Sequence, residues 1–178
     1  MPSYQILPQI DFFNNTALKE IQSRDLSLQI LELNETTAEY GFVLSEKDAA
    51  ELVQTRNKSL YDNDRIEMSI GIVAKIIEKF SKSSFVNQSN YAETLNELLD
   101  VFYYVKSEAR DKISDNDLLD RLYDYYENKC YGSMELMTGR EIEILLRYIH
   151  RDKKSYDLEE EDDYGSEPEW IDPHMGED

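Results

Sequence analysis

The residue types that most often perform catalysis or bind metals are scarce in this sequence. It contains two histidines, His150 and His174, and one cysteine, Cys130. A di-iron helical bundle uses a Glu-x-x-His pair, but the residue three positions before His150 is Arg147. Cys130 has Lys129 beside it, but the nearby acids Asp124 and Glu127 argue against an activated thiol. We therefore expect no catalytic residue, no metal site, no cofactor and no enzyme activity.

Motifs that bind phosphate or calcium are also incomplete. The six glycines are dispersed, so neither a P-loop nor a dinucleotide-binding fingerprint can be drawn. Two acidic stretches begin like calcium loops, at Asp62 and Glu160. Ile66 and Tyr164 occupy their fifth positions, where an oxygen ligand is required. The acidic C-terminus could still hold divalent cations loosely.

The overall charge argues against further classes of protein. The chain has 178 residues and a formal net charge of −19, and residues 157–178 contain eleven acids with no Lys or Arg. Such a field disfavours direct binding to nucleic-acid phosphates. A single cysteine allows no intrachain disulfide, and the sequence has neither a secretory leader nor a run of about 18 apolar residues. These features predict a cytoplasmic protein without membrane contact.

The apolar residues recur three and four positions apart, which is typical of helices. No proline lies between Pro8 and Pro168, so long helices are permitted. The predicted buried stripes are Ile66–Ile70–Val73–Ile77–Phe80, Tyr91–Leu95–Leu98–Phe102–Val105, Leu118–Leu122–Tyr125 and Ile142–Leu145–Ile149. We expect an all-α fold, a single compact helical bundle of about six helices. No internal repeat of fixed period is visible in the residue types.

Five of the predicted helices share a start signal, a capping side chain three residues before an acid. The pairs are Ser45–Asp48, Asp64–Glu67, Asn90–Glu93, Ser114–Asp117 and Thr138–Glu141. Another helix is predicted from Asp25, which breaks a short preceding helix, to Tyr40, with Gly41 as its stop. Arg56 lies near an apolar face and is expected to need a carboxylate partner.

The two ends of the chain differ from this body. We assign residues 1–156 to one helical domain and residues 157–178 to an acidic, flexible tail. Residues 4–13 are largely apolar but interrupted by Pro8, which favours an extended arm laid over the body or over a partner. In the tail, Tyr164 and Trp170 lie among acids. That tail is a solvated extension, a segment that docks on a partner, or one that docks on the basic run 147–154.

Tyrosine is over-represented, with 13 copies against 6 of Phe. A buried stripe cannot accommodate every tyrosine of 103–104 and 123–126, and Tyr104 and Tyr123 are expected to be the most exposed. Tyrosine offers a large contact area at low entropic cost, so an acid-rimmed group of tyrosines is typical of an interaction surface. The alternative is that these tyrosines cap the core with hydroxyls in water. The candidate interaction residues are Tyr103, Tyr104, Tyr123, Tyr126, Tyr164 and Trp170.

These observations predict a non-enzymatic interaction or adaptor protein whose partner is a protein with a basic surface. The alternative is an acidic mimic of nucleic acid that inhibits a nucleic-acid-binding protein. Whether the chain self-associates stays open.

The middle of the chain also resembles an uncharacterised bacterial family, a domain of unknown function from Gram-positive anaerobes. The resemblance covers roughly residues 26–135. It is carried by Tyr40-Gly41, Leu44-Ser45, Arg56, Leu60, Arg65-Ile66-Glu67, Phe80, Tyr91, Leu95, Leu98, Phe102-Tyr103-Tyr104, Lys106, Ser114-Asp115, Leu118 and Gly132-Ser133. It implies a small bacterial cytosolic protein and assigns no functional site.

Overall fold

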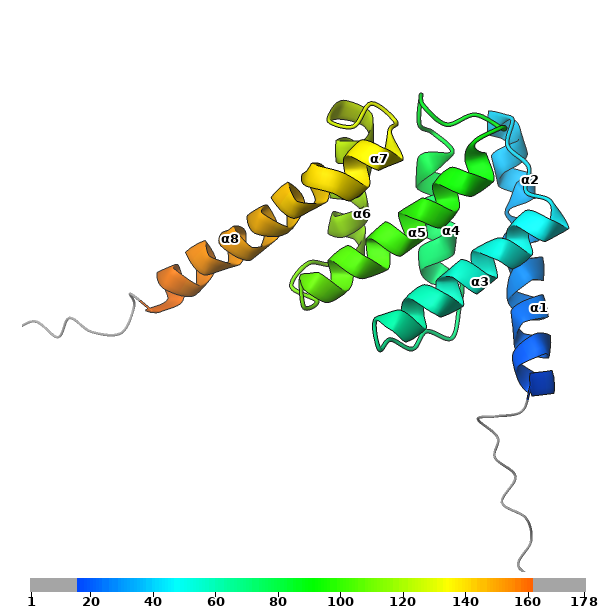
Figure 1. Ribbon diagram of the computed structural model, residues 1–178, viewed down its shortest axis with the longest axis horizontal. Coiled ribbons are helices and arrows are strands. Elements are labelled where there is room, and N and C mark those ends of the chain that lie inside the picture. Colours follow the sequence, from blue (N-terminus) through cyan, green and yellow to red (C-terminus); the bar gives the residue numbers. More distant parts are fainter. Residues whose placement is uncertain (1–15, 162–178) are drawn as a thin grey trace, which may run out of the picture.

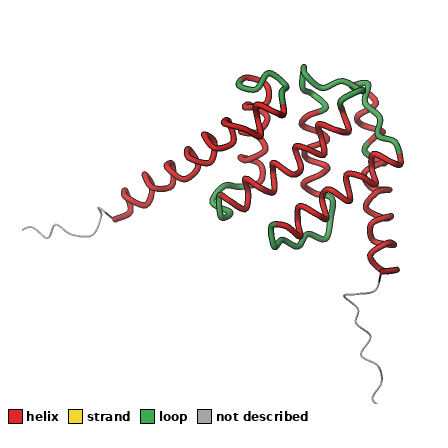
Figure 2. The backbone as a smooth tube through the Cα atoms, in the orientation of Figure 1, coloured by secondary structure: helices red, strands yellow, loops and turns green. Residues whose placement is uncertain are grey.

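Every regular element in the described part of the chain is helical. The computed structural model describes the backbone of residues 16–161 and the side chains of residues 19–151. The elements are α1 (Thr16–Glu32), α2 (Asn34–Thr37), η1 (Ala38–Tyr40), α3 (Glu46–Asp62), α4 (Gly71–Phe80), α5 (Tyr91–Glu108), α6 (Asp115–Asn128), α7 (Met134–Leu136), the π-helical η2 (Met137–Glu141) and α8 (Ile142–Glu161). Short loops connect them (Figure 2). The predicted all-α bundle is confirmed, and the proposed N-terminal arm lies outside the described residues.

The helices form two layers. In Figure 1, α3, α5 and α8 run in the same direction, from upper right to lower left, with α5 in the middle. α5 packs against α3 on one side and α8 on the other, and α4 and α6 pack behind it. α1 packs against α3 at the far end of the row. α5 has helices on both sides and behind it, and it therefore buries more residues than α3, α4 or α6.

Hydrogen bonds between residues 41 positions apart fix the register of both layers. Thr55 on α3 donates to the side chain of Asn96 on α5 across 2.6 Å, and one turn later Ser59 donates to Asp100. In the other layer Lys75 on α4 donates to Asn116 on α6 across 2.9 Å. Because each pair has the same separation, α3–α4 and α5–α6 stack as two equivalent hairpins.

The buried positions of these hairpins repeat with a spacing of 46 residues. Ala49, Leu52, Val53, Arg56, Ser59 and Leu60 on α3 correspond to Leu95, Leu98, Leu99, Phe102, Val105 and Lys106 on α5, and all twelve are buried. Ile72, Val73, Ile76 and Phe80 on α4 correspond likewise to Leu118, Leu119, Leu122 and Tyr126 on α6. Stacked hairpins of this kind are typical of helical-repeat proteins, in which each unit contacts only its neighbours. The burial pattern therefore contains a repeat that the residue types conceal.

Two of the predicted start signals are confirmed as side-chain caps. The Oγ of Ser45 accepts from the backbone N–H of Asp48 across 3.2 Å, and the Asp48 carboxylate accepts from the backbone N–H of Ser45 across 2.9 Å. Ser114 caps α6 through the N–H of Asp117 at 3.1 Å. Gly41 also ends η1 as predicted, with φ of 85° in the left-handed region.

The signal at Asp64 is wrong. Residues 63–70 form a loop, α4 begins only at Gly71, and Ile66 is 90% exposed, so it does not belong to the buried stripe. The cause is Arg56, whose Nη2 donates to the backbone carbonyls of Glu67 at 2.8 Å and Ser69 at 2.7 Å. Because these carbonyls accept from Arg56, the segment does not form the backbone hydrogen bonds of a helix.

Two further start signals also fail as side-chain caps. The side chain of Asn90 accepts from the N–H of Asn87 across 2.8 Å rather than from the first turn of α5. Thr138 donates backwards to the carbonyl of Met134 across 2.9 Å, and the kink at Gly139 delays α8 to Ile142. Side chains that can bond in either direction are ambiguous signals.

Asp25 does not interrupt α1. Its carboxylate accepts from the side chain of Gln29 across 2.8 Å on the exposed side of the helix. Leu26 and Ile30 are buried beside it, and packing of an apolar face outweighs the modest helix propensity of a single Asp. At the other end α8 runs through residue 156 to Glu161, so the helix crosses the boundary predicted for the domain.

Candidate functional site

α5 exposes only acids and one tyrosine. Its exposed residues are Glu93, Glu97, Asp100, Tyr104 and Glu108. Steps of four, three, four and four residues place them on one side of the helix, and we call these five residues the acidic strip. The one basic residue of α5, Lys106, is buried and does not offset the charge.

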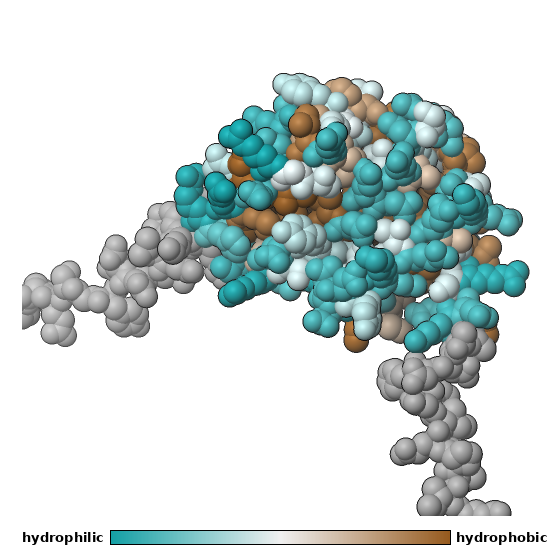
Figure 3. All heavy atoms as spheres, in the orientation of Figure 1, coloured by the Kyte–Doolittle hydropathy of each residue, from teal (hydrophilic) through white to brown (hydrophobic). Residues whose placement is uncertain are grey.

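The packing of α5 determines where the acidic strip points. α3 and α8 contact its flanks, and α4 and α6 pack behind it (Figure 1), so the side of α5 that carries the strip is the one without a packed helix. The surface in this orientation is predominantly hydrophilic (Figure 3). The opposite side of α5 buries residues such as Leu98, Phe102 and Val105, which hold the strip on a rigid element.

The acids of the strip are crowded. Partial burial raises the pKa of Glu97, and the negative charge of Glu93 raises it further. Asp100 accepts a hydrogen bond from Ser59 of α3. The neighbouring Lys58 is held mainly by Asp62, at 2.7 Å, and that bond raises the pKa of Lys58, with a smaller contribution from Asp100. The strip thus presents negative charge that its surroundings only partly balance.

Tyr103 and Tyr104 have opposite environments although they are adjacent in the sequence. Tyr104 lies in the acidic strip and is 48% exposed. Tyr103 is completely buried, and its hydroxyl donates to the Glu67 carboxylate across 2.8 Å. The interpretation of Tyr103 as a surface contact is therefore wrong, because a step of one residue turns a helical side chain by about 100°.

The tyrosines of α6 lie in a different part of the molecule. Tyr126 is buried, with its ring 5.5 Å from that of Phe80, so its assignment to the surface is wrong as well. Tyr123 is half-buried against α4, where its ring also contacts Phe80 and its hydroxyl donates to the backbone carbonyl of Lys82 across 3.3 Å. Tyr104 and Tyr123 therefore do not share one surface. Tyr164 and Trp170 lie outside the described residues.

A second polar surface lies between α4 and α6. A hollow of about 490 Å³ is lined there by Lys75, Lys79, Lys82 and Tyr123, among others. The Lys79 ammonium lies 5.3 Å from the centre of the Tyr123 ring and pairs with Asp120. Lys75 and Lys79 bond to Asn116 and Asp120 and so join α4 to α6, which is a structural role.

Two buried cations hold the loops that flank α5. Contrary to the expectation of a carboxylate partner, the described bonds of Arg56 run to the side chain of Asn57 and to two backbone carbonyls. Lys106 donates to the carbonyl of Ile113 across 2.5 Å and pairs with Asp115 at 2.7 Å. Each cation satisfies groups of a neighbouring loop, which is a positioning role.

The residue types most often used in catalysis or metal binding are not grouped into a site among the described side chains. Cys130 is fully buried, and burial together with the nearby charge of Glu141 raises its pKa to about 11. His150 is exposed on α8. Within the described side chains, no three His, Cys, Asp or Glu residues are grouped as a metal would require. Within residues 16–161, no helix combines the length and the apolar composition needed to cross a bilayer.

Sequence reasoning identified Tyr104 but not the strip around it. The signal was present, because Glu93, Glu97, Asp100 and Glu108 follow helical spacing on the side opposite the predicted stripe of α5. Acids elsewhere in the chain are so numerous that this spacing does not stand out.

Comparison with known proteins identifies the family. The family model described as "Family of unknown function (DUF6323)" matches residues 29–155, which extends beyond the expected range of 26–135 at the C-terminal end. No curated protein and no solved structure matches the chain. Because the family model covers most of the helices, from α1 into α8, the chain belongs to this family of unknown function.

Proposed function

We propose that this protein is a non-enzymatic interaction module that binds a basic segment of a partner protein along the acidic strip. The observation that carries the proposal is the composition of the exposed side of α5, four carboxylates around Tyr104. Carboxylates steer a basic partner and fix its orientation. An exposed aromatic ring on a rigid helix adds apolar contact area, and aromatic residues often dominate binding energy.

The position of the strip also supports the proposal. It lies on the middle helix of a row of three, and stacked helices of repeat proteins commonly form extended binding surfaces. From residue 93 to residue 108 the strip spans about 22 Å of helix, enough for several turns of a partner helix or an extended peptide. We further propose a bacterial cytoplasmic location, since a single buried cysteine suits a reducing compartment.

A matched pair of variants tests the proposal. The strip variant is Glu93→Gln/Glu97→Gln/Tyr104→Ala. The control is Glu35→Gln/Glu39→Gln/Tyr40→Ala on α2 and η1, which makes the same charge change and removes a tyrosine that is also 48% exposed. Each immobilised protein is used to capture partners from a lysate of its native host. A stoichiometric partner retained by the wild-type and control proteins and lost by the strip variant supports the proposal, and retention by all three contradicts it.

The second candidate function is mimicry of nucleic acid, which is favoured by the same negative charge. A mimic occupies the phosphate-binding groove of its target, so duplex DNA or RNA competes with it and its affinity falls steeply with salt. A partner bound partly through Tyr104 keeps most of its affinity at high salt. Release of the captured partner by added nucleic acid would select mimicry over the proposed role.

A further inference from the structure

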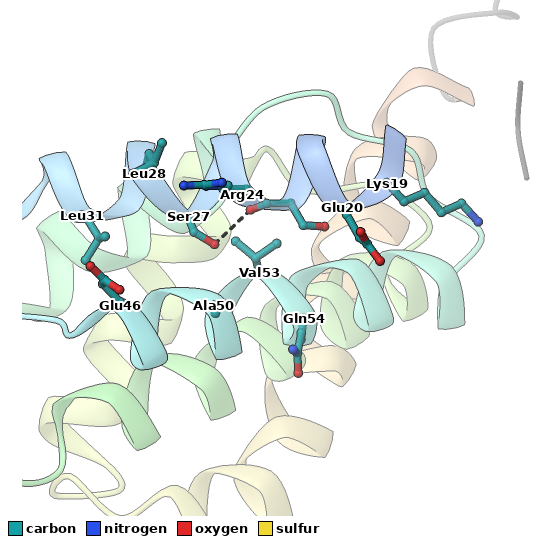
Figure 4. A pocket seen from close by; sticks show the side chains of 11 residues that line it. Lys19, Glu20, Arg24, Ser27, Leu28, Leu31, Glu46, Ala50, Val53 and Gln54 are labelled. Carbon is teal, nitrogen blue, oxygen red and sulfur yellow. Dashed lines mark hydrogen bonds between the residues drawn. The ribbon is translucent and has the colours of Figure 1, made fainter. Parts of the chain in front are cut away.

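The most exposed apolar side chains of the described chain gather in one loop. A hollow of about 570 Å³ opens between α1 and α3, but charged side chains such as Lys19 and Arg24 line much of it (Figure 4). Among the described side chains, the most exposed large apolar or aromatic ones are Ile66, Tyr61 and Met68, at 90%, 83% and 78%. They lie at the end of α3 and in the loop that follows it, and we call these three residues the loop cluster.

The loop that carries Ile66 is anchored on both sides of this residue. The backbone carbonyl of Glu67 accepts from α3, and the Glu67 carboxylate accepts from Tyr103 of α5 across 2.8 Å. Arg65 pairs with Asp111, just beyond the end of α5. Arg65 and Glu67 are half-buried, whereas Ile66 between them is exposed. A side chain on an anchored loop is already positioned, so less ordering is required when a partner binds.

The loop between α5 and α6 has the same backbone arrangement 46 positions later. The N–H groups of Asp64 and Arg110 donate to the carbonyl three residues earlier, across 3.2 Å and 2.9 Å. Those of Arg65 and Asp111 donate to the carbonyl five residues earlier, across 2.8 Å and 3.2 Å. Asp64 and Arg110 also have positive φ, of 52° and 50°. The two loops can therefore be compared position by position.

The outward side chains of the two loops differ. Ile66 and Met68 correspond to Lys112 and Ser114, and all four are exposed. The same backbone thus forms with polar side chains at these positions, so the fold does not require Ile66 and Met68 to be apolar. Exposed apolar side chains that gather in one place are typical of an interaction surface.

The surroundings of the loop cluster favour a basic partner. Asp62 and Asp64 are exposed beside it. The one base within residues 61–69, Arg65, is half-buried and paired with Asp111. Asp111 follows Glu108, the last residue of the acidic strip, by three positions. A basic segment that lies along the strip therefore reaches this loop at one end.

The size and charge of the loop cluster favour a short segment of a partner protein over other occupants. A stable dimer buries about 800 Å² on each copy, and three side chains of about 150–200 Å² each offer less than that. The net charge of −19 opposes binding to an anionic membrane surface. We propose that the loop cluster binds apolar side chains of the partner segment whose basic side chains lie along the acidic strip, an inference that rests on the proposed function.

Two labelled synthetic peptides test the proposal with the full-length protein. One consists of six lysines, which extend over about 20 Å, and the other carries Leu-Phe-Leu after the same six lysines. Fluorescence anisotropy should show that wild type binds the second peptide at least about fivefold more tightly than the first. Ile66→Gln/Met68→Ser should reduce this gain to less than about twofold and leave the affinity for six lysines unchanged.

A matched control removes two exposed apolar side chains elsewhere. Ile21→Gln/Leu136→Ser replaces residues that are 66% and 54% exposed, and it should keep the gain of wild type. Circular dichroism should show the same helix content for both double variants, since polar residues occupy the equivalent positions of the second loop. An equal loss of the gain in the control would overturn the inference.

The strip variant described above separates this inference from the proposed function. It should weaken the binding of both peptides. If it does so while Ile66→Gln/Met68→Ser keeps the fivefold gain, the role of the loop cluster is overturned and that of the acidic strip stands. If the strip variant binds six lysines as wild type does, the proposed function itself is contradicted.

Two further measurements address the other occupants. Sedimentation that shows a wild-type dimer dissociated by Ile66→Gln/Met68→Ser would assign the loop cluster to a second copy of the chain. Binding of wild type, but not of this variant, to phosphatidylserine vesicles would assign it to a membrane surface. Either result would overturn the inference.

Discussion

The hydroxyl of Tyr103 donates a hydrogen bond to the carboxylate of Glu67 across 2.8 Å, joining the middle of α5 to the loop before α4. The backbone carbonyl of the same Glu67 accepts from Arg56 of α3 at 2.8 Å. One loop residue is thus bonded to two stacked helices, and this arrangement connects the first hairpin to the second. Burial, reinforced by the Glu67 charge, raises the pKa of Tyr103, so its hydroxyl stays protonated and remains a donor.

Removing this donor should measure what the contact contributes. Tyr103→Phe keeps the buried ring but leaves the Glu67 carboxylate without its partner, and we expect the free energy of unfolding to fall by about 1–3 kcal/mol. Tyr104→Phe is the matched control. Tyr104 is exposed, so its substitution should change the free energy of unfolding by less than about 0.5 kcal/mol. Chemical denaturation of both variants gives the comparison. Equal effects would show that the hydrogen bond to Glu67 does not contribute to stability.

Two glycines with positive φ allow the cost of backbone strain to be compared with the cost of steric overlap. Gly41 has φ of 85° and open space around it, so Gly41→Ala should cost only the left-handed strain, about 1–2 kcal/mol. Gly132 has φ of 77°, and a Cβ there would overlap the side chain of Phe85. Gly132→Ala should therefore destabilise the protein by clearly more than Gly41→Ala. Thermal unfolding of the two variants tests the order, and the reverse order would contradict the packing of Phe85 against this turn.

The partial burial of Glu97, together with the nearby charge of Glu93, predicts a pH dependence of stability. The folded state raises the pKa of Glu97 above that of the unfolded chain, so the folded protein holds the proton more tightly. The contribution of Glu97 to stability is therefore present below the unfolded value of about 4.3 and is lost as the pH rises through the folded value.

Glu97→Gln should consequently be more stable than wild type at pH 7 and indistinguishable from it near pH 4. Glu93→Gln should also stabilise at pH 7, because it removes the charge that repels Glu97. Urea unfolding at the two pH values provides the measurement. A Glu97→Gln variant that is less stable than wild type at pH 7 would mean that the strip is not under electrostatic strain.

The thiol of Cys130 should be unreactive in the folded protein. Its pKa of about 11 leaves very little thiolate at pH 8, and the side chain is fully buried. We expect alkylation by iodoacetamide to be at least a hundredfold slower in native protein than in denaturant. Labelling at the rate of an exposed thiol would require that the region between α6 and α8 opens readily.

The sequence was sufficient to predict elements whose signals are local. Ser45 and Ser114 each precede an acid by three residues, and both accept from the backbone N–H of that acid. The stripe Tyr91–Leu95–Leu98–Phe102–Val105 is buried throughout because α5 is surrounded by other helices. Such signals depend on spacing alone, which the residue order contains.

Predictions that depended on tertiary partners failed. Asp64–Glu67 has the same local pattern as the true caps, but Arg56 from another helix holds that loop open. The repeat was invisible because equivalent buried positions hold unlike residues: Arg56 corresponds to Phe102, and Leu60 corresponds to Lys106. A buried cation and an aromatic ring occupy similar space only when the surrounding loops supply acceptors, and sequence alone does not reveal those acceptors.

The stacked arrangement also determines how the molecule should come apart. α5 has helices on both flanks and behind it, whereas α8 lies at the end of the row and contacts α5 along one side. Detaching α8 exposes its interface with α5, but detaching α5 disrupts the interfaces with α3, α4, α6 and α8. Partial unfolding should therefore begin at the C-terminal helix, and limited proteolysis should remove α8 while leaving α3 to α6 folded.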